Sequence, residues 1–523
     1  MSLRKRAIRT ASACAMLIAP HAAGDDPKNI LFIAIDDLRP ALGCYGDPHA
    51  ITPNIDRLAA RGTIFANAHC QQAVCAPSRV SLLTGLRPDT TRVWDLATKF
   101  RDHIPGAVTL PQHMRSFGYT TAGVGKIFDV RSTDRMFDEV SWSIPFEGSV
   151  SSPADESFSY RDPDHVALVL EKKPLAREAG VRGSKEIQLQ VVGVRPSTDK
   201  ADVPDEAYDD GAIATRGIEM IEELAPADEP FFIAIGFRKP HLPFNAPSRY
   251  WDLYQRDQFE RPVSTKLPNG APSFAFQDSS ELRNNYTDVP PKGVPIPEDD
   301  RLRLTHGYYA CVSYIDAQVG RLLDALEASD EVDDTIIVLW GDHGFHLGDH
   351  GMFCKHTNYE MATRVPLVFV SPDVGANAEP HDGPVEFVDV FPTLCDLAGI
   401  KTPDNLHGVS LRPAMEDVSH DVKPIAVSQY RRSAGRGVRV TGYAVRDRRY
   451  RYIEWRDAHG ITGPGTGPIV AVELYDYEHD PHERRSVAED PRYASEIERL
   501  RGLLHEGKFI GADDAHGGHS TRQ

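Results

Sequence analysis

The chain has 523 residues, of which 41% are hydrophobic and 26% are charged, and its formal net charge is −18. This composition is globular, and the length suggests either two or three units or one large α/β domain with an appendage. Such negative charge excludes a protein that binds nucleic acid through bulk electrostatic attraction. Seven cysteines spread over so long a chain do not form a disulfide scaffold.

The N-terminus resembles an export signal. Four basic residues within 4–9 precede a weakly apolar run over 11–20 and three small residues at 22–24. Removing them takes away four basic and no acidic residues, so the net charge changes from −18 to −22. The segment is too short to span a membrane, and no later segment is long and apolar enough. We therefore expect 1–23 to be a signal peptide, and the mature protein to be periplasmic or secreted, or lysosomal in a eukaryote, without a membrane span.

Four short apolar runs predict buried parallel strands. Polar residues follow each run directly: Asp36 and Asp37 follow 30–35, Lys126 follows 119–124, Lys239 and His241 follow 231–235, and Asp342 and His343 follow 336–340. In open α/β sheets, ligands bind outside the carboxyl ends of the strands. We therefore expect these four distant segments to converge on one site.

Helical patterns fill the intervals between these strands. One begins at Thr52-Pro53 and ends at Gly62, and longer ones cover 205–224, 301–328 and 386–398. The alternation of strands and helices predicts an α/β fold. We interpret 143–204 and 256–300 as irregular surface excursions that frame the site.

The pattern changes after about residue 410. Short β-like runs at 442–445 and 450–455 predict a smaller antiparallel sheet. We therefore expect a catalytic domain over 25–410 and a C-terminal α+β subdomain over 411–510. The tail 511–523, rich in Gly, His and Asp, is expected to be disordered.

The run QQAVCAPSRVSLLTGLRPDTT carries the most informative motif, Cys75-Ala76-Pro77-Ser78-Arg79. Pro77 suits the first turn of a helix, and Gly85 is placed to end that helix. Cys75 would then lie at a helix N-terminus, where free N–H groups and the helix dipole favour an anion. A buried thiol beside an ordinary helix cap is the alternative that the residues alone leave open.

The motif matches the C-x-P-S-R signature, and the chain resembles the type I, formylglycine-dependent sulfatases. The resemblance implies an alkaline-phosphatase-like α/β sandwich with a large mixed, mainly parallel sheet and a smaller C-terminal antiparallel-sheet subdomain. It also implies that a formylglycine-generating enzyme oxidises Cys75 to formylglycine (3-oxoalanine). The hydrated aldehyde would then be the nucleophile that attacks the sulfur of a sulfate ester.

Hard oxygen ligands indicate a divalent cation. Adjacent carboxylates such as Asp36-Asp37 are often only a loop, but with Asp342-His343 they suit Ca²⁺ or Mg²⁺ better than Zn²⁺. The resemblance implies one ion, usually Ca²⁺, held by Asp36, Asp37, Asp342, His343 and the modified Cys75.

Basic residues complete the predicted site, although a solvated surface position is the default for any lysine. Lys126 in GVGKIF and Lys355 in GMFCKH match the family lysines that bind the sulfate group, and Arg79 resembles the arginine that fixes the nucleophile. His241 in FRKPHLPF corresponds to the family histidine near the leaving-group oxygen, where it can donate a proton, and Lys239 is a further substrate ligand.

One catalytic position departs from the family pattern. Asp129 stands where the family has a histidine that accepts a proton in the step releasing sulfate. A carboxylate can do this, and nearby Lys126 and a divalent ion should lower its pKa.

Within the family the resemblance is strongest to the iduronate-2-sulfatases, over about 28–400 and more weakly over 440–485. It implies a sulfated oligosaccharide substrate, with removal of a 2-O-sulfate from a terminal uronic acid. Arg436 and Arg439 are the candidate ligands of the uronate carboxylate. Phe345 and His356 depart from the residues expected beside the site, so the sugar can differ.

Two alternatives remain open at this point. One is a formylglycine-dependent phosphonate monoester or phosphodiester hydrolase. The other is a non-catalytic glycan-binding pseudoenzyme in which Cys75 stays unconverted.

Overall fold

The computed structural model describes residues 27–134, 137–150, 160–181, 185–435, 437–458, 464–507 and 509–510. The expected signal peptide, the expected tail and Arg436 lie outside the described residues. Among the helices within these ranges, none has the length and apolar character needed to cross a membrane.

A six-stranded sheet forms the centre of the molecule, in the order β2-β12-β8-β1-β6-β4. The four strands predicted from apolar runs are confirmed as parallel neighbours: β1 (Asn29–Ile35), β4 (Thr120–Gly125), β6 (Phe231–Phe237) and β8 (Thr335–Gly341). β12 (Leu367–Val370) and β2 (Thr63–Ile64) extend the sheet in antiparallel pairings. Every residue of β1, β6 and β8 is buried, because a parallel sheet is covered on both faces.

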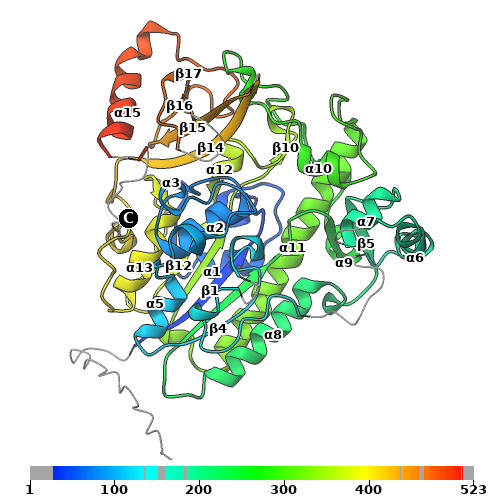
Figure 1. The fold of residues 1–523 in the computed structure, drawn as a ribbon. Helices are drawn as coiled ribbons and strands as arrows, with labels where there is room; N and C mark the ends of the chain where they lie inside the picture. Colours follow the sequence, from blue (N-terminus) through cyan, green and yellow to red (C-terminus); the bar gives the residue numbers. More distant parts are fainter. Residues whose placement is uncertain are drawn as a thin grey trace, which may run out of the picture.

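Helices cover both faces of this sheet (Figure 1). Alternate residues of β1 point to opposite sides, so Leu31 and Ile33 belong to one apolar cluster and Phe32 to another. The first cluster includes residues of α1 (Pro53–Ala59), α8 (Asp209–Leu224) and α11 (Glu298–Ala328). The second includes residues of α2 (Cys75–Thr84), α5 (Leu110–Ser116) and α13 (Val390–Leu397). The helices expected at 205–224, 301–328 and 386–398 are therefore present.

A second, antiparallel sheet lies in the C-terminal part of the chain. Its strands follow sequence order: β14 (Ala426–Gly435), β15 (Val438–Arg446), β16 (Tyr450–Asp457) and β17 (Ile469–Asp476). α15 (Ala494–Glu506) packs on one face of the sheet through Leu500 and Leu504. This is the smaller antiparallel sheet that the change in sequence pattern predicts.

Buried ion pairs and a backbone hydrogen bond connect the C-terminal sheet to the part of the chain around the central sheet. The Arg451 guanidinium on β16 is fully buried and contacts the carboxylates of Glu360 and Glu483, the latter at 3.2 Å. The start of β14 is tied to the segment before α2, because the Gln429 amide donates to the Gln71 carbonyl at 2.7 Å. β14 therefore lies beside the helix that begins with Cys75.

The interpretation of 143–204 as irregular is wrong. This segment contains α6 (Pro163–Glu178), α7 (Lys185–Val191) and β5 (Thr198–Ala201), and β5 pairs with β7 (Phe244–Pro247). α6 carries charged residues throughout its second half and includes Pro174, and it lacks the apolar periodicity by which helices are recognised. The segment 256–300 is largely irregular, as expected, but it includes α10 (Ser280–Asn285).

The remaining described elements are short. They are α3 (Pro88–Thr91), α4 (Phe100–His103), α9 (Ser248–Trp251), α12 (Glu360–Thr363), α14 (Arg412–Glu416), β3 (Ala68–His69), β9 (His346–Leu347), β10 (Phe353–Cys354), β11 (Arg364–Val365) and β13 (Val385–Glu386).

Candidate active site

The carboxyl ends of the parallel strands converge as the sequence predicts. Asp36 and Asp37 follow β1, and Asp342 and His343 follow the adjacent β8; all four are buried. The Asp342 amide donates to the Ile35 carbonyl at 3.1 Å, so strand-like pairing continues into the site. Asp37 has a φ of 62°, a left-handed conformation that non-glycine residues rarely adopt outside functional or strained positions.

Cys75 is the first residue of α2, and Gly85 ends this helix in the left-handed conformation. The preceding Val74 is extended, so the chain turns into the helix at the cysteine itself. The Cys75 thiol is buried, and its sulfur lies 3.4 Å from Nε2 of His343. The helix predicted from Pro77 and Gly85 thus places the motif against the carboxylates.

Two overlapping sets of residues could hold a cation here. Asp36, Cys75, Asp342 and His343 offer ligand atoms that all lie within 4.8 Å of one another, and Asp36, Asp37 and His241 form the second set. Burial, together with the nearby Asp36 charge, raises the pKa of the Asp342 carboxyl, although His343 and Arg79 oppose the shift. Crowded carboxylates of this kind suit a hard divalent ion.

The orientation of His343 also fits a metal ligand. Its Nδ1 lies 3.0 Å from the Gly344 carbonyl, which accepts the ring N–H. Nε2 faces the carboxylate oxygens of Asp37 at 3.3 Å and Asp342 at 3.5 Å. A metal-ligating histidine commonly donates its other ring N–H to a backbone carbonyl, so an imidazole held in this way beside two carboxylates fits a cation site.

Arg79 ties the cluster together from within. Its Nε lies 2.9 Å from Asp342 Oδ2 and its Nη2 lies 3.1 Å from Asp36 Oδ1, so one buried guanidinium contacts both carboxylates. Nη1 donates to the carbonyls of Lys126 and Ile127, just beyond β4. Although burial opposes its charge, Asp342 and Asp36 raise the pKa of Arg79 above its usual range.

Two lysines from distant parts of the sequence contact the carboxylates. Lys126 Nζ lies 2.6 Å from Asp36 Oδ2, and Lys355 Nζ lies 3.0 Å from both oxygens of Asp37. Burial raises the pKa of Asp36, but the charges of Lys126 and Arg79 hold it well below its ordinary value. Lys355 enters the site from a strained turn, since its neighbours Cys354 and His356 both have positive φ angles, 67° and 69°.

Glu281 is a site residue that the sequence analysis missed. Its Oε1 lies 2.8 Å from Lys355 Nζ and 3.0 Å from His241 Nε2. Burial raises the pKa of this carboxyl, but Lys355 and His241 hold it well below its usual range. Glu281 belongs to α10, within a stretch that carries no motif and no apolar periodicity. Only the three-dimensional contacts identify it.

Asp129 is buried, and both of its carboxylate oxygens contact Arg131. Oδ1 accepts from Nε at 2.8 Å and from the backbone amide at 3.1 Å, and Oδ2 accepts from Nη2 at 2.7 Å. Burial raises the pKa of Asp129, but hydrogen bonds from Arg131 and the Lys126 charge bring it below its ordinary value. The direction agrees with the sequence expectation, and Arg131 is a contributor that the sequence analysis did not name.

The other expected substrate ligands are placed differently. Lys239 Nζ donates to the carbonyls of His241 at 2.6 Å and Pro243 at 2.7 Å, so it holds the turn that carries His241. Arg439 is exposed on β15, opposite Ser433 of β14. Phe345 is buried and stacks on Tyr308 with ring centroids 5.4 Å apart.

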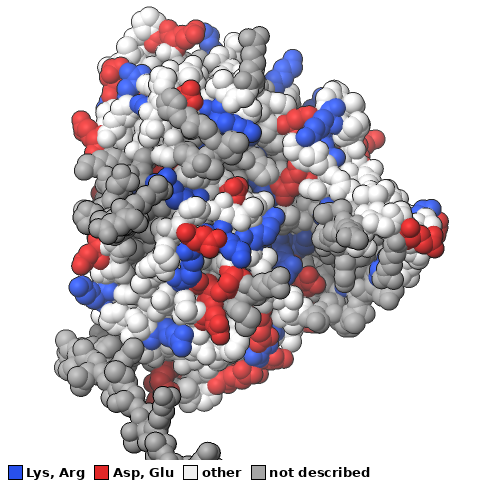
Figure 2. Space-filling model, viewed as in Figure 1, with Lys and Arg blue, Asp and Glu red and all other residues white. Residues whose placement is uncertain are grey.

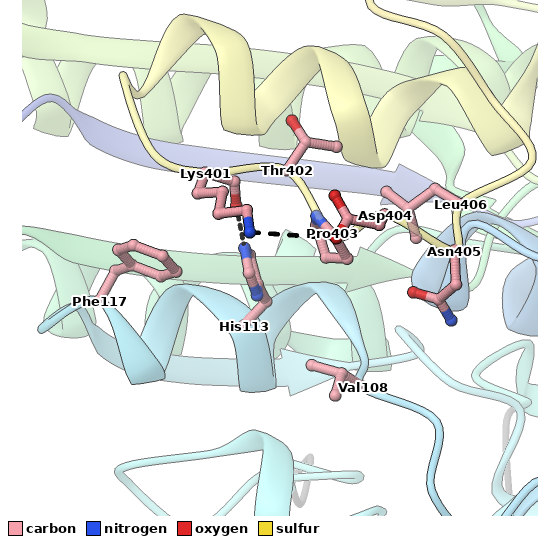
Figure 3. A pocket seen from close by; sticks show the side chains of 9 residues that line it. All are labelled: Val108, His113, Phe117, Lys401, Thr402, Pro403, Asp404, Asn405 and Leu406. Carbon is pink, nitrogen blue, oxygen red and sulfur yellow. Dashed lines mark hydrogen bonds and ion pairs between the residues drawn. The ribbon is translucent and has the colours of Figure 1, made fainter.

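A cavity of about 250 Å³ lies elsewhere in the molecule (Figure 3). It is lined by Val108, by His113 and Phe117 at α5, and by 401–406. His113 Nε2 lies 2.8 Å from the Lys401 carbonyl, and burial lowers the pKa of this histidine. Asp36, Asp37 and Asp342 do not line this cavity, so the cavity is separate from the candidate active site.

Comparisons with known proteins identify the family of this chain. The sulfatase family model matches residues 28–400, and a model of the N-sulphoglucosamine sulphohydrolase C-terminal region matches 348–508. The chain therefore belongs to the type I sulfatase family and is a sulfuric ester hydrolase.

Relatives in sequence and structure cover most of the chain. It is 32% identical to iduronate 2-sulfatase of Homo sapiens, over 89% of this chain and 92% of that protein. It is 25% identical to a Δ4,5-hexuronate-2-O-sulfatase of Bacteroides thetaiotaomicron, over 95% and 92% respectively. The structure of a phosphonate monoester hydrolase from Silicibacter pomeroyi superimposes with a TM-score of 0.70 at 22% identity, covering 92% of this chain and 95% of that one. The alkaline-phosphatase-like fold expected from the sequence is confirmed.

Replacing Glu281 with Gln should weaken sulfate-ester hydrolysis. Lys355 and His241 would each lose a charged acceptor, and one such bond is worth about 1.5–3 kcal/mol, so we expect kcat/KM to fall about 10-fold or more. The measurement is steady-state hydrolysis of an aryl sulfate, with Glu260→Gln, an exposed glutamate of the same segment, as the control. Equal rates for the two variants would exclude Glu281 from the site.

Proposed function

We propose that this chain is an exported sulfatase that hydrolyses sulfate esters of a sulfated glycan through a formylglycine formed at Cys75 and one divalent cation. The observation that carries the proposal is the position of Cys75, at the start of α2, among three carboxylates, Arg79, the buried Lys355 and the half-buried Lys126. We further propose exo-action on a terminal uronic acid 2-O-sulfate. Residues 25–410 would form the catalytic domain and 411–510 the C-terminal subdomain.

The unmodified thiol of Cys75 is a poor nucleophile in these surroundings. Burial and the Asp36 charge raise its pKa well above the ordinary value, although Lys126 and Lys355 act in the opposite direction. A thiol attacks only as the thiolate, which this environment disfavours. Oxidation by a formylglycine-generating enzyme would instead supply a hydrated aldehyde, whose hydroxyl is the nucleophile.

The cation would be held by Asp36, Asp37, Asp342, His343 and the modified Cys75. When bound, it supplies positive charge beside the nucleophile and the sulfate. Asp36, Asp37, Asp342 and Glu281 are paired with Arg79, Lys126 and Lys355, so much of the positive charge of these basic residues is offset within the protein. A bound cation would add positive charge that attracts an anionic substrate. The oxygen-rich ligand set favours Ca²⁺, with Mg²⁺ as the second choice.

The basic residues would bind the sulfate group and assist its transfer. Each lysine ammonium has three donors, and the contact of Lys126 with Asp36 leaves it donors for sulfate oxygens. Lys355 already donates to Asp37 and Glu281, so it would act on the sulfate group mainly through its positive charge. Fixed donors of this kind stabilise charge that develops in the transition state. Figure 2 shows basic side chains interspersed with acidic ones on the face in view, so the negative net charge of the chain does not make this face uniformly acidic.

His241 would protonate the leaving group. Its Nδ1 lies 2.6 Å from the Leu242 carbonyl and its Nε2 faces Glu281. Both ring nitrogens thus face acceptor oxygens, an arrangement that the doubly protonated ring satisfies. One of these protons can pass to the oxygen that leaves the sulfur.

The choice of substrate rests on the relatives named as acting on 2-O-sulfated uronates. The likeness of fold to a phosphonate monoester hydrolase favours that activity as the second candidate. The exported location, periplasmic or secreted, belongs to the same proposal.

Rates on matched substrates separate these candidates. The enzyme produced with its maturation enzyme should hydrolyse 4-nitrophenyl sulfate and 2-O-sulfated uronides faster than a 4-nitrophenyl phosphonate monoester or phosphodiester. Cys75→Ala should abolish turnover and leave the fold intact. Faster hydrolysis of the phosphorus esters would overturn the proposal, and so would undiminished sulfatase activity of Cys75→Ala.

Chelation should inactivate the enzyme, and Ca²⁺ or Mg²⁺ should restore it. The carboxylates and His343 would then face one another without a cation, so Ca²⁺ should also raise the thermal unfolding midpoint. The measurements are aryl sulfate hydrolysis and thermal unfolding before and after adding back each ion, with Asp342→Asn as a variant whose midpoint responds less. Restoration by Zn²⁺ alone would contradict a hard-cation site.

We propose Asp129 as the base of the release step, and its pH dependence is the test. Its lowered pKa keeps the carboxylate ionised in acid, so activity is present above that pKa and is lost as pH falls through it. Asp129→His should raise the acidic limb of the kcat profile by roughly two pH units or more, since an ordinary histidine titrates near 6.5. Asp129→Asn should slow turnover at all pH values, and Arg131→Gln should raise the limb modestly. An unmoved limb in Asp129→His would assign the release step to another group.

A further inference from the structure

Arg432 is a cation beside the site without an anionic partner. It lies on β14 and is half-buried, and no carboxylate of the described residues lies within ion-pair distance of its guanidinium. Its Nη2 donates to the His356 carbonyl, and its buried Nε contacts no acceptor. By contrast, buried Arg79 and Arg451 each contact two carboxylates. A buried charge normally has such a partner, so Arg432 is an exception that a ligand would explain.

The described groups around the Arg432 guanidinium do not compensate its positive charge with a carboxylate. Burial lowers the pKa of Arg432, and only the hydroxyls of Tyr430 and Tyr359 act in the opposite direction. Guanidinium groups stay protonated in proteins even when buried, so the positive charge persists. Burial also lowers the pKa of the adjacent His356 to about 3, against the raising effect of Glu281. Of the neighbouring Arg432 and His356 side chains, Arg432 is therefore charged and His356 is neutral.

Arg432 lies close to Lys355, the lysine proposed to bind the sulfate group. It contacts the carbonyl of His356, the residue directly after Lys355, whose ammonium lies in the carboxylate cluster. The guanidinium carbon of Arg432 lies 4.5 Å from the centroid of the Tyr430 ring. The centroids of the Tyr430 and His356 rings are 6.1 Å apart. Arg432 on β14 thus contacts the backbone of the residue next to Lys355, and the Tyr430 ring lies near both the Arg432 guanidinium and the His356 ring.

We propose that Arg432 binds the carboxylate of the sugar that carries the sulfate ester. The inference rests on the proposed sulfated-uronide substrate and names the residue that would recognise its second anionic group. The planar guanidinium fork matches a carboxylate with two parallel hydrogen bonds, which a lysine cannot reproduce. This assignment replaces Arg439, which is exposed on the opposite strand of the hairpin, and Arg436, which lies outside the described residues.

A purely structural role is the rival explanation. Arg432 could serve only to hold the turn over 354–356, since its bond to the His356 carbonyl supports a segment with two positive φ angles. Loss of that support would displace Lys355 and weaken hydrolysis of every sulfate ester. A role in carboxylate binding would weaken only substrates that carry a carboxylate, so paired substrates separate the two.

The experiment compares a 2-O-sulfated uronide glycoside with the same glycoside after reduction of its carboxylate to a hydroxymethyl group, and the measurement is the rate at which inorganic sulfate is released. The variants are Arg432→Gln, Arg432→Lys and the control Arg439→Gln, all in the matured full-length enzyme. For Arg432→Gln we expect kcat/KM on the uronide to fall about 10- to 100-fold, the loss of one charge-assisted hydrogen-bonded pair, and to change less than about threefold on the reduced glycoside. Arg432→Lys should lose less on the uronide, and Arg439→Gln should match the wild type on both.

The outcomes separate the inference from the proposed function. Equal losses on both substrates in Arg432→Gln and Arg432→Lys would overturn carboxylate binding while leaving the sulfatase activity in place. A selective loss in Arg439→Gln would also overturn it, in favour of the exposed arginine. Failure of the wild type to hydrolyse the uronide, although it hydrolyses 4-nitrophenyl sulfate, would overturn the uronide substrate and this inference together. Failure on both would overturn the proposed function itself.

Discussion

The burial of like charge at the carboxyl ends of β1 and β8 is the constraint on which the rest of the site depends. Asp36, Asp37 and Asp342 stand almost completely out of solvent, on adjacent strands whose pairing fixes their separation. Carboxylates in this arrangement repel one another and resist desolvation, so each needs a cation. Arg79 satisfies two of them at once, and Lys126 and Lys355 reach Asp36 and Asp37 from distant parts of the chain.

The fold supplies these partners through elements that have little else in common. Lys126 follows β4, two strands away from β1 in the sheet, and Arg79 comes from the first turns of α2. The turn that carries Lys355 is bordered by the C-terminal sheet, because the guanidinium of Arg432 on β14 contacts the His356 carbonyl. Buried pairs of Arg451 with Glu360 and Glu483 hold that sheet in place. The smaller sheet therefore contributes to the site as well as to stability.

Much of this arrangement is predictable from the sequence for a physical reason. A fully buried parallel strand must be continuously apolar, so the runs before Asp36, Lys126, His241 and Asp342 are visible in the sequence, and their common direction brings the residues after them to one edge. Glu281 and Arg432 could not be found in this way, because their importance arises from contacts between segments without local periodicity. α6 was missed because its charged, proline-containing sequence does not show an apolar stripe. The carboxylate-binding arginine was sought in 436–439 for its local basic composition, whereas burial without a counter-ion distinguishes Arg432.

The central claim is that Cys75 acts after oxidation and that the thiol itself does not. The most direct measurement is mass spectrometry of the Cys75 peptide, quantified in enzyme preparations made with graded amounts of a formylglycine-generating enzyme, together with the rate of aryl sulfate hydrolysis of each preparation. The account predicts a rate that rises in proportion to the fraction of Cys75 converted and that vanishes when none is converted. Full activity in a preparation whose Cys75 is entirely unconverted would contradict it.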